Sequence, residues 1–117
     1  MKIRRQSLES LLSMNSEQTS QRVKLGDQLE VPREIDHLGY FAKRAHAAAA
    51  AAELTEDGMR TSISRRGFST FALEVDTESD VELETADAFV ERMFTLIEKH
   101  GGVYDGWGGP VVLKANK

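Results

Sequence analysis

Two helical segments of opposite character divide this sequence, and each one lies between segments with strand patterns. The first begins near Lys43 and holds seven alanines between residues 45 and 52. Alanine is the strongest helix former, and its small side chain lets a helix approach a sheet closely. The second repeats apolar residues at spacings of three and four, which is typical of a helix with one buried face. The members of this stripe are Leu83, Ala86, Val90, Met93, Phe94 and Ile97.

Four short segments around these helices have the composition of strands. They are residues 34–41, 59–64, 68–75 and 103–107. In the third, apolar and polar residues alternate with the period of two that marks a half-buried strand. The order strand, helix, strand, strand, helix, strand predicts a ferredoxin-like α+β fold, with a four-stranded antiparallel-type sheet and both helices on one face. Within residues 77–84, either Ser79 and Glu82 form a capping box or the helix begins at Thr85.

The N-terminal region has a separate pattern. Leu8, Leu11 and Leu12 lie on one helical face, which predicts a short helix over about residues 5–14. The polar stretch that follows, residues 15–21, is predicted to be a mobile connection. We therefore expect residues 1–30 to form a helix and linker, residues 31–113 to form the folded domain, and residues 114–117 to be a disordered tail.

Composition limits the class of function. At 117 residues the chain suits one domain, and the absence of cysteine excludes disulfides and thiolate metal sites. No apolar run reaches the length that spans a bilayer, so a cytoplasmic protein without membrane contact is expected. The net charge is −4, but residues 74–87 hold seven acids and no base. Such a segment repels phosphate and attracts a basic protein; alternatively it is a solvated loop and helix start.

The residues that could carry chemistry do not form an enzymatic pattern. His37, His46 and His100 are spaced unlike metal ligands, so no metal or other cofactor is expected. Asp36 and His37 are adjacent on a predicted strand and so point to opposite faces, which prevents acid–base cooperation. We therefore expect that the protein is not an enzyme. Direct nucleic-acid binding is also not expected, because one predicted central strand lacks exposed aromatics for base stacking.

Two motifs resemble a known family. Residues 104–108 read YDGWG after a helix and a glycine turn, and residues 32–37 read PREIDH before Tyr40–Phe41 and the alanine-rich helix. Together they resemble the RraB family of bacterial ribonuclease E regulators over about residues 31–113. This resemblance implies a ferredoxin-like fold. It also implies binding to the arginine-rich, non-catalytic scaffold region of that endoribonuclease, inhibition of its activity, and hence an effect on RNA turnover.

Candidate partner-binding residues come from both motifs and from the acidic segment. If the last strand pairs with the first, the two motifs lie close together, and Trp107 is a possible interface anchor; the alternative for Asp105 and Trp107 is a structural role in the turn and core edge. The candidates are Asp36, His37, Tyr104, Asp105, Trp107, Glu78, Asp80, Glu82 and Glu84. A second hypothesis is a different partner or a small-ligand or enzymatic pocket around the YDGW turn. A third is homo-oligomerisation through the open sheet face.

Overall fold

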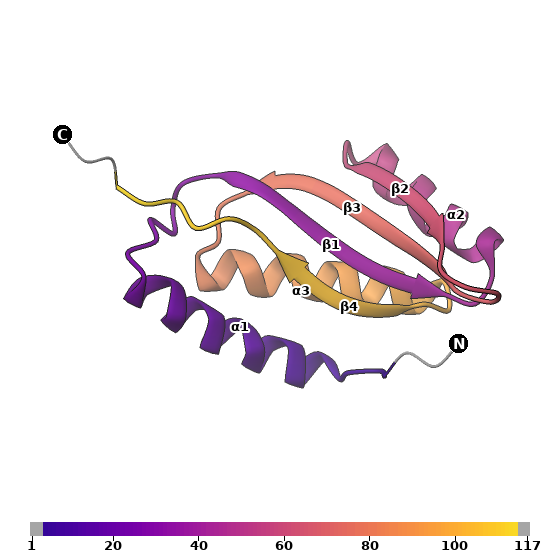
Figure 1. Cartoon of the computed structure of the whole chain (residues 1–117), viewed down its shortest axis with the longest axis horizontal. Helices are drawn as coiled ribbons and strands as arrows, with labels where there is room; N and C mark the ends of the chain where they lie inside the picture. Colours follow the sequence, from indigo (N-terminus) through magenta and orange to yellow (C-terminus); the bar gives the residue numbers. More distant parts are fainter. Residues whose placement is uncertain (1–3, 115–117) are drawn as a thin grey trace.

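The computed structural model describes residues 4–114 and shows one sheet with its helices on one side (Figure 1). The strand order is β2-β3-β1-β4, and each neighbouring pair is antiparallel. This confirms the predicted ferredoxin-like arrangement. The elements in chain order are α1 (Leu8–Lys24), β1 (Arg33–Phe41), α2 (Arg44–Glu56), β2 (Arg60–Arg65), β3 (Phe71–Ser79), α3 (Leu83–Lys99) and β4 (Val103–Gly108).

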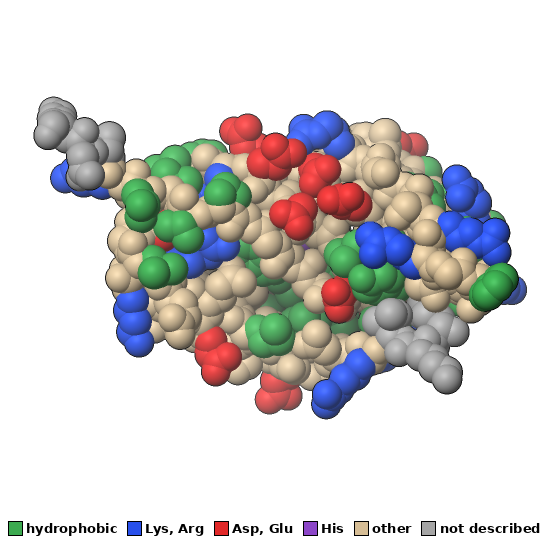
Figure 2. All heavy atoms as spheres, viewed as in Figure 1, with side chains coloured by type: hydrophobic (Ala, Val, Ile, Leu, Met, Phe, Trp, Pro, Cys, Tyr) green, Lys and Arg blue, Asp and Glu red, His purple; other side chains and the backbone are tan. Residues whose placement is uncertain are grey.

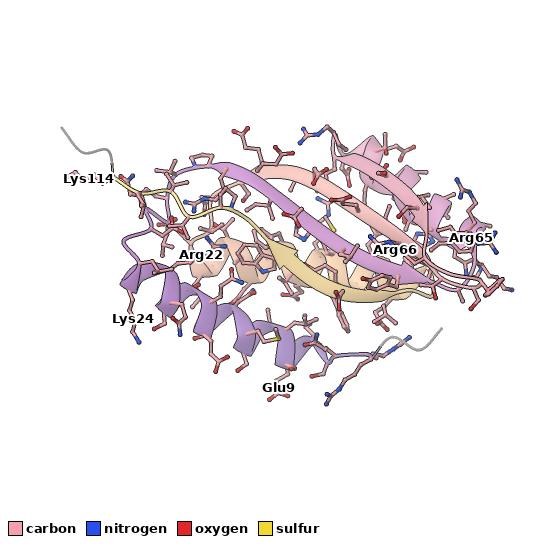
Figure 3. The ribbon with its side chains drawn as sticks, viewed as in Figure 1. Glu9, Arg22, Lys24, Arg65, Arg66 and Lys114 are labelled. Atoms are coloured by element: carbon pink, nitrogen blue, oxygen red, sulfur yellow. The ribbon has the colours of Figure 1, made fainter. Side chains whose placement is uncertain are left out.

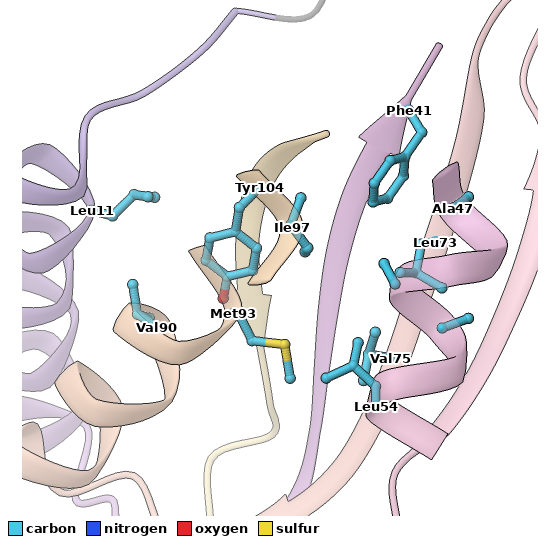
Figure 4. Packing of buried hydrophobic residues seen from close by; sticks show 12 residues of the cluster. Leu11, Phe41, Ala47, Leu54, Leu73, Val75, Val90, Met93, Ile97 and Tyr104 are labelled. Carbon is cyan, nitrogen blue, oxygen red and sulfur yellow. The ribbon is translucent and has the colours of Figure 1, made fainter. Parts of the chain in front are cut away.

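The core lies between the sheet and the two helices α2 and α3 (Figure 4). The alanine-rich helix α2 buries Ala47, Ala50 and Leu54 against the strands, as its small side chains predicted. Most of the apolar stripe of α3 is also buried, including Val90 and Met93. Alternation along β1 and β3 supplies the sheet side of the core, because every second residue faces the helices.

The N-terminal helix is longer than its apolar pattern predicts. α1 begins after Ser7, whose side chain caps the helix by accepting from the Ser10 N–H at 3.0 Å, and it continues to Lys24. The polar stretch 15–21, expected to be a mobile connection, is therefore helical. From residue 15 onward, the buried positions of α1 are the polar residues Asn15 and Arg22, and both are hydrogen-bonded. A search for apolar spacing cannot detect a helix anchored in this way.

Two further boundaries differ from those expected. β3 runs on to Ser79, and α3 begins at Leu83 rather than Thr85. The capping box of Ser79 and Glu82 does not form; instead Asp80 Oδ1 accepts from the Glu82 N–H at 3.0 Å. Of the predicted disordered tail 114–117, residues 115–117 lie outside the described residues.

α1 packs along α3, at the β4 side of the molecule (Figure 1). Leu11 joins the core cluster, so α1 is part of the same packed unit as the sheet. The opposite face of the sheet has no described helix on it. None of the helices in residues 4–114 has the length and hydropathy required to cross a bilayer.

Candidate functional site: an acidic face on the open side of the sheet

The open side of the sheet carries a group of acids that we call the acidic sheet face. β1 turns Glu34 and Asp36 outward, since Ile35 and His37 between and beyond them are fully buried on the helix side. β3 presents its acids to the same face through the same alternation. The acidic sheet face consists of Glu34, Asp36, Glu74, Asp76 and Glu78.

The register of β1 and β3 places like charges directly opposite one another. Glu34 pairs with Glu78, and Asp36 pairs with Asp76. Like charges at such positions destabilise a sheet, because the facing side chains lie close together. Arg60 of β2 forms an ion pair with Glu34 and lies beside Asp76 in the register. Figure 2 shows Asp and Glu side chains gathered over the middle of this face. The arrangement concentrates negative charge where no described element covers it.

The other acids of the segment 74–87 leave the sheet. Asp80 and Glu82 lie in the connection between β3 and α3. Glu84 is in the first turn of α3, where the helix dipole stabilises a negative charge. Glu82 and Glu84 are exposed. Asp87 faces α1 instead and accepts from Asn15 Nδ2 at 3.0 Å. The segment therefore divides into the acids of the acidic sheet face, a loop group at the start of α3 that consists of Asp80, Glu82 and Glu84, and the structural residue Asp87.

The YDGW motif turns its two aromatics toward the helices by means of a β-bulge. Tyr104 pairs with Gly39 and Gly106 pairs with Leu38, which leaves Asp105 without a partner in the register. Gly106 has φ +119°, a conformation that other residues rarely adopt. Because the bulge adds one residue, Tyr104 and Trp107 both face the helix side although they are three positions apart. Regular alternation would place them on opposite faces.

The pairing of the two motifs is confirmed, and it produces a buried contact. His37 lies opposite Trp107 in the β1–β4 register, and its Nδ1 is 2.8 Å from the Tyr104 hydroxyl. Burial lowers the pKa of His37 from 6.5 to about 4, so the ring is neutral at physiological pH. Burial, with Asp105 and Asp36 nearby, raises the pKa of Tyr104. His37 and Tyr104 are buried, whereas Asp36 and Asp105 are exposed, so the residues of the two motifs do not form one exposed patch.

Trp107 is held from three sides. Its ring packs edge-to-face on Phe89 with centroids 4.9 Å apart, and its Nε1 donates to Asn15 Oδ1 at 2.9 Å. The guanidinium of Arg22 lies 5.3 Å from the ring centroid, within the range of a cation–π contact. These contacts give the half-buried indole a structural role that joins α1, α3 and β4.

A buried ion cluster that was not predicted from the sequence lies next to Trp107. Asp27 accepts from Arg33 at 2.7 Å and from Arg22 at 3.0 Å, and all three side chains are almost fully buried. Desolvation opposes the charged form of Asp27, but the hydrogen bonds from Arg33 and Arg22 prevail and hold its pKa below the usual value. Both arginines also donate to the Pro110 carbonyl, and Arg22 reaches from α1 toward the C-terminal segment (Figure 3). The PREIDH match contained Arg33, but nothing in the spacing indicated its partners.

The histidines are separated in the structure. His46 is exposed on α2, while His100, at the C-cap of α3, is hydrogen-bonded to Glu53 of α2 and connects the two helices. The hydrogen bonds from His100 and Lys99 hold the pKa of Glu53 below its ordinary value. Within residues 4–114 no group of three or more His, Cys, Asp or Glu side chains is placed to hold a metal ion.

The cavity nearest the YDGW turn differs from the pocket that the second hypothesis requires. A cavity of about 90 Å³ between α1 and β4 is lined by Asp105 and Trp107, together with Leu11 and Asn15 of α1. Asp36 and Tyr104 do not line it. The volume is well below that of ordinary small-molecule sites, which begin at roughly 300 Å³.

Comparison with known proteins gives a consistent result. The family model described as "Regulator of ribonuclease activity B" matches residues 13–109. Curated proteins named "Regulator of ribonuclease activity B" are similar over 42 residues, at 38% identity for Haemophilus influenzae, 36% for Actinobacillus succinogenes and 38% for Aeromonas hydrophila.

The curated matches are partial. The aligned residues make up 36% of this chain in each case, and 28%, 30% and 36% of the respective relatives. The match to the family model is broader, since it includes most of α1 and every strand of the sheet. This chain therefore belongs to the family described as Regulator of ribonuclease activity B.

Proposed function

We propose that this chain regulates a ribonuclease by binding it as a protein partner, without catalysis of its own. Family membership and the names of the relatives support a ribonuclease as the partner. More specifically, we propose that the partner is an endoribonuclease of the ribonuclease E type in the bacterial cytoplasm. The contact would be with its arginine-rich, non-catalytic scaffold region, and the consequence would be lower nuclease activity and slower RNA turnover.

The acidic sheet face is the observation that carries this proposal. Its like-charge pairs place Glu34 opposite Glu78 and Asp36 opposite Asp76 in the unbound chain, and Arg60 offsets part of their repulsion through its ion pair with Glu34. An arginine placed between such carboxylates relieves that repulsion and can donate to two oxygens at once. The same charge would accelerate encounter with a basic segment at low salt. An arginine-rich region is therefore the kind of partner that this face fits.

The same face disfavours two other roles. A phosphate backbone would meet carboxylates, and on β3 the outward positions that could stack bases are Ala72, Glu74 and Asp76. Homo-oligomerisation through this face would set acids against acids. A basic protein segment is the occupant that avoids both conflicts.

The proposal can be tested by calorimetry with the purified chain and the scaffold region of ribonuclease E, at low salt and at about 0.15 M salt, where the Debye length is about 8 Å. One variant reverses two charges on the acidic sheet face, Glu74→Lys with Glu78→Lys. A second reverses two in the loop group, Glu82→Lys with Glu84→Lys. The matched control, Glu9→Lys with Glu17→Lys, makes the same change in net charge on exposed positions of α1.

We expect salt to weaken binding and the face variant to lose affinity by about tenfold or more, with the control close to wild type. A loss confined to the loop variant would move the contact to residues 80–84. Absence of binding by the wild-type chain at low salt would refute the ribonuclease E proposal. Equal losses in the face variant and the control would show that only net charge matters and would refute the role of this face.

A further inference from the structure

The far end of β3 forms a free strand edge. β2 pairs with β3 from Phe71 to Asp76 and extends no further, because Arg60, the partner of Asp76, is the first residue of β2. Residues 77–79 continue to pair with β1 on one side. On their other side the described part of the chain supplies no strand, and Figure 1 shows β3 extending past β2. Such an edge can accept an extended segment of another protein.

A cavity lies beneath this edge, between β3 and α3. Its volume is about 290 Å³, and its walls are largely apolar, with Met59, Phe89 and Met93 among the lining residues. Thr77 and Ser79 contribute the strand side. The volume is at the lower limit for small-molecule sites, so it suits one large side chain better than a cofactor. Methionine side chains adapt readily, so Met59 and Met93 can move to admit a guest.

His37 supplies an unpartnered polar atom at the floor of this cavity. It lines the cavity but is fully buried, and its Nδ1 is already occupied by the Tyr104 hydroxyl at 2.8 Å. Its Nε2, on the other side of the ring, has no hydrogen-bond partner among the described residues. A buried polar nitrogen without a partner is costly, and a guest that reached it would remove that cost.

The shape and chemistry select one kind of guest. An aromatic side chain with a polar tip fills apolar walls and still offers a hydrogen bond at its end. A tyrosine hydroxyl both donates and accepts, so it suits either tautomer of His37. Around the opening, Glu78 lines the cavity, Asp80 and Glu82 follow in the chain, and Arg92 is paired with Asp57. The residues that flank the guest tyrosine are therefore expected to be basic.

We propose that an extended basic segment of the partner pairs with β3 along Thr77–Ser79 and inserts a tyrosine side chain into this cavity, where its hydroxyl bonds His37 Nε2. This inference rests on the proposed function and adds the docking mode and the anchor residue. Glu78 belongs to the acidic sheet face and also lines the cavity on the other side of β3, so one segment along this strand edge can contact both.

Filling the cavity from the α3 side tests the inference. Ala88 lines the cavity and is exposed, so Ala88→Trp can block it while leaving the core intact. Ala49→Trp makes the same change at an exposed position of α2 and serves as the matched control. We expect Ala88→Trp to weaken binding of the ribonuclease E scaffold region by about tenfold or more, since a blocked anchor pocket removes a hot spot. Ala49→Trp should bind like wild type.

A second measurement does not depend on the partner. The chain has four methionines, so methyl-labelled methionine gives a simple spectrum, and p-cresol serves as a probe with the shape of a tyrosine side chain. We expect p-cresol to shift the Met59 and Met93 methyl signals, to leave the exposed Met14 unchanged, and to lose its effect in Ala88→Trp. Wild-type affinity in Ala88→Trp, or no shift at Met59 and Met93, would overturn the inference. Failure of the wild-type chain to bind the scaffold region would instead count against the proposed function.

Discussion

His37 makes folding sensitive to mild acid. Its pKa is about 4 in the folded chain against an ordinary 6.5, so the unfolded chain binds more protons between these values. Stability is therefore full above pH 6.5 and falls as the pH decreases toward 4, by up to about 3 kcal/mol. Urea unfolding of wild type and His37→Asn at several pH values checks this. The asparagine amide can replace Nδ1 as the partner of Tyr104 but cannot titrate, so the variant should lose most of the slope in this range.

Tyr104→Phe separates the effect of His37 titration from the loss of the hydrogen bond between His37 and Tyr104. It removes the 2.8 Å contact but leaves His37 buried, so the slope between pH 6.5 and 4 should remain. A slope that persists in His37→Asn would show that another group controls the acid sensitivity. Asp27 and Glu53 have lowered pKa values, so the stability they contribute is present above their unfolded values and is lost as the pH falls below them. His37→Asn retains both acids and so allows for their contribution.

At the scale of elements, α1 is attached by polar groups at the middle and near the end of its packed face, after the apolar contact of Leu11. Asn15 bridges Asp87 and Trp107, and near the end of the helix Arg22 joins the buried cluster with Asp27 and Arg33. Asp27→Asn would leave two buried guanidiniums without their counter-charge. We expect it to lower the free energy of unfolding by about 3–5 kcal/mol, the usual cost of breaking a buried ion pair. Urea denaturation measures the loss.

Asn15→Ala gives the milder counterpart of this change. It removes two hydrogen bonds outside the ion cluster, so we expect a loss of about 1–3 kcal/mol and faster amide exchange in α1 than in β1 or β3. Uniformly faster exchange would contradict a local role for Asn15. Wild-type stability in Asp27→Asn would contradict the anchoring role of the ion cluster.

Whether an element could be predicted from the sequence depends on the kind of contact that holds it in the fold. α2, α3, β1 and β3 bury apolar residues at regular spacing, and β2 and β4 have strand-like composition, so the order of the elements and the ferredoxin-like fold could be predicted. The second half of α1 could not, because Asn15 and Arg22 are its buried residues there and their partners are distant in the chain. The inward turn of Trp107 depends on the bulge at Asp105, which alternation does not reveal.

The candidate site was predictable only in part, for a related reason. The acids of β3 are visible as a cluster in the sequence, and the segment was expected to favour a basic partner. Glu34 contributes to the acidic sheet face only because the register brings it opposite Glu78. The cavity under β3 brings together Met59 of the α2–β2 connection, Thr77 of β3 and Phe89 of α3, so no local pattern predicts it.

At the scale of the whole molecule, the acidic sheet face is expected to lower stability in return for partner binding. Asp76→Asn with Glu78→Gln removes one charge from each like-charge pair of β1 and β3 while keeping the side-chain shape. Relief of the Asp36–Asp76 pair should raise the free energy of unfolding by about 0.2–1 kcal/mol, and relief of the Glu34–Glu78 pair should add less, because Arg60 already offsets the charge of Glu34. The gain should shrink in high salt, because screening already weakens the repulsion in the wild-type chain. Affinity for the basic partner should fall in the same variant.

This combination distinguishes a surface kept for binding from one that is merely solvated. Substitution of a residue that contributes only to folding would lower stability and affinity together. Here stability should rise while affinity falls. Urea unfolding at low and high salt gives the stability, and calorimetry with the ribonuclease E scaffold region gives the affinity. Asn15→Gln serves as a reference, because it alters an amide away from the open face and should not raise stability. If the double variant gained stability and bound the partner as well as wild type, the acidic sheet face would not be the contact surface.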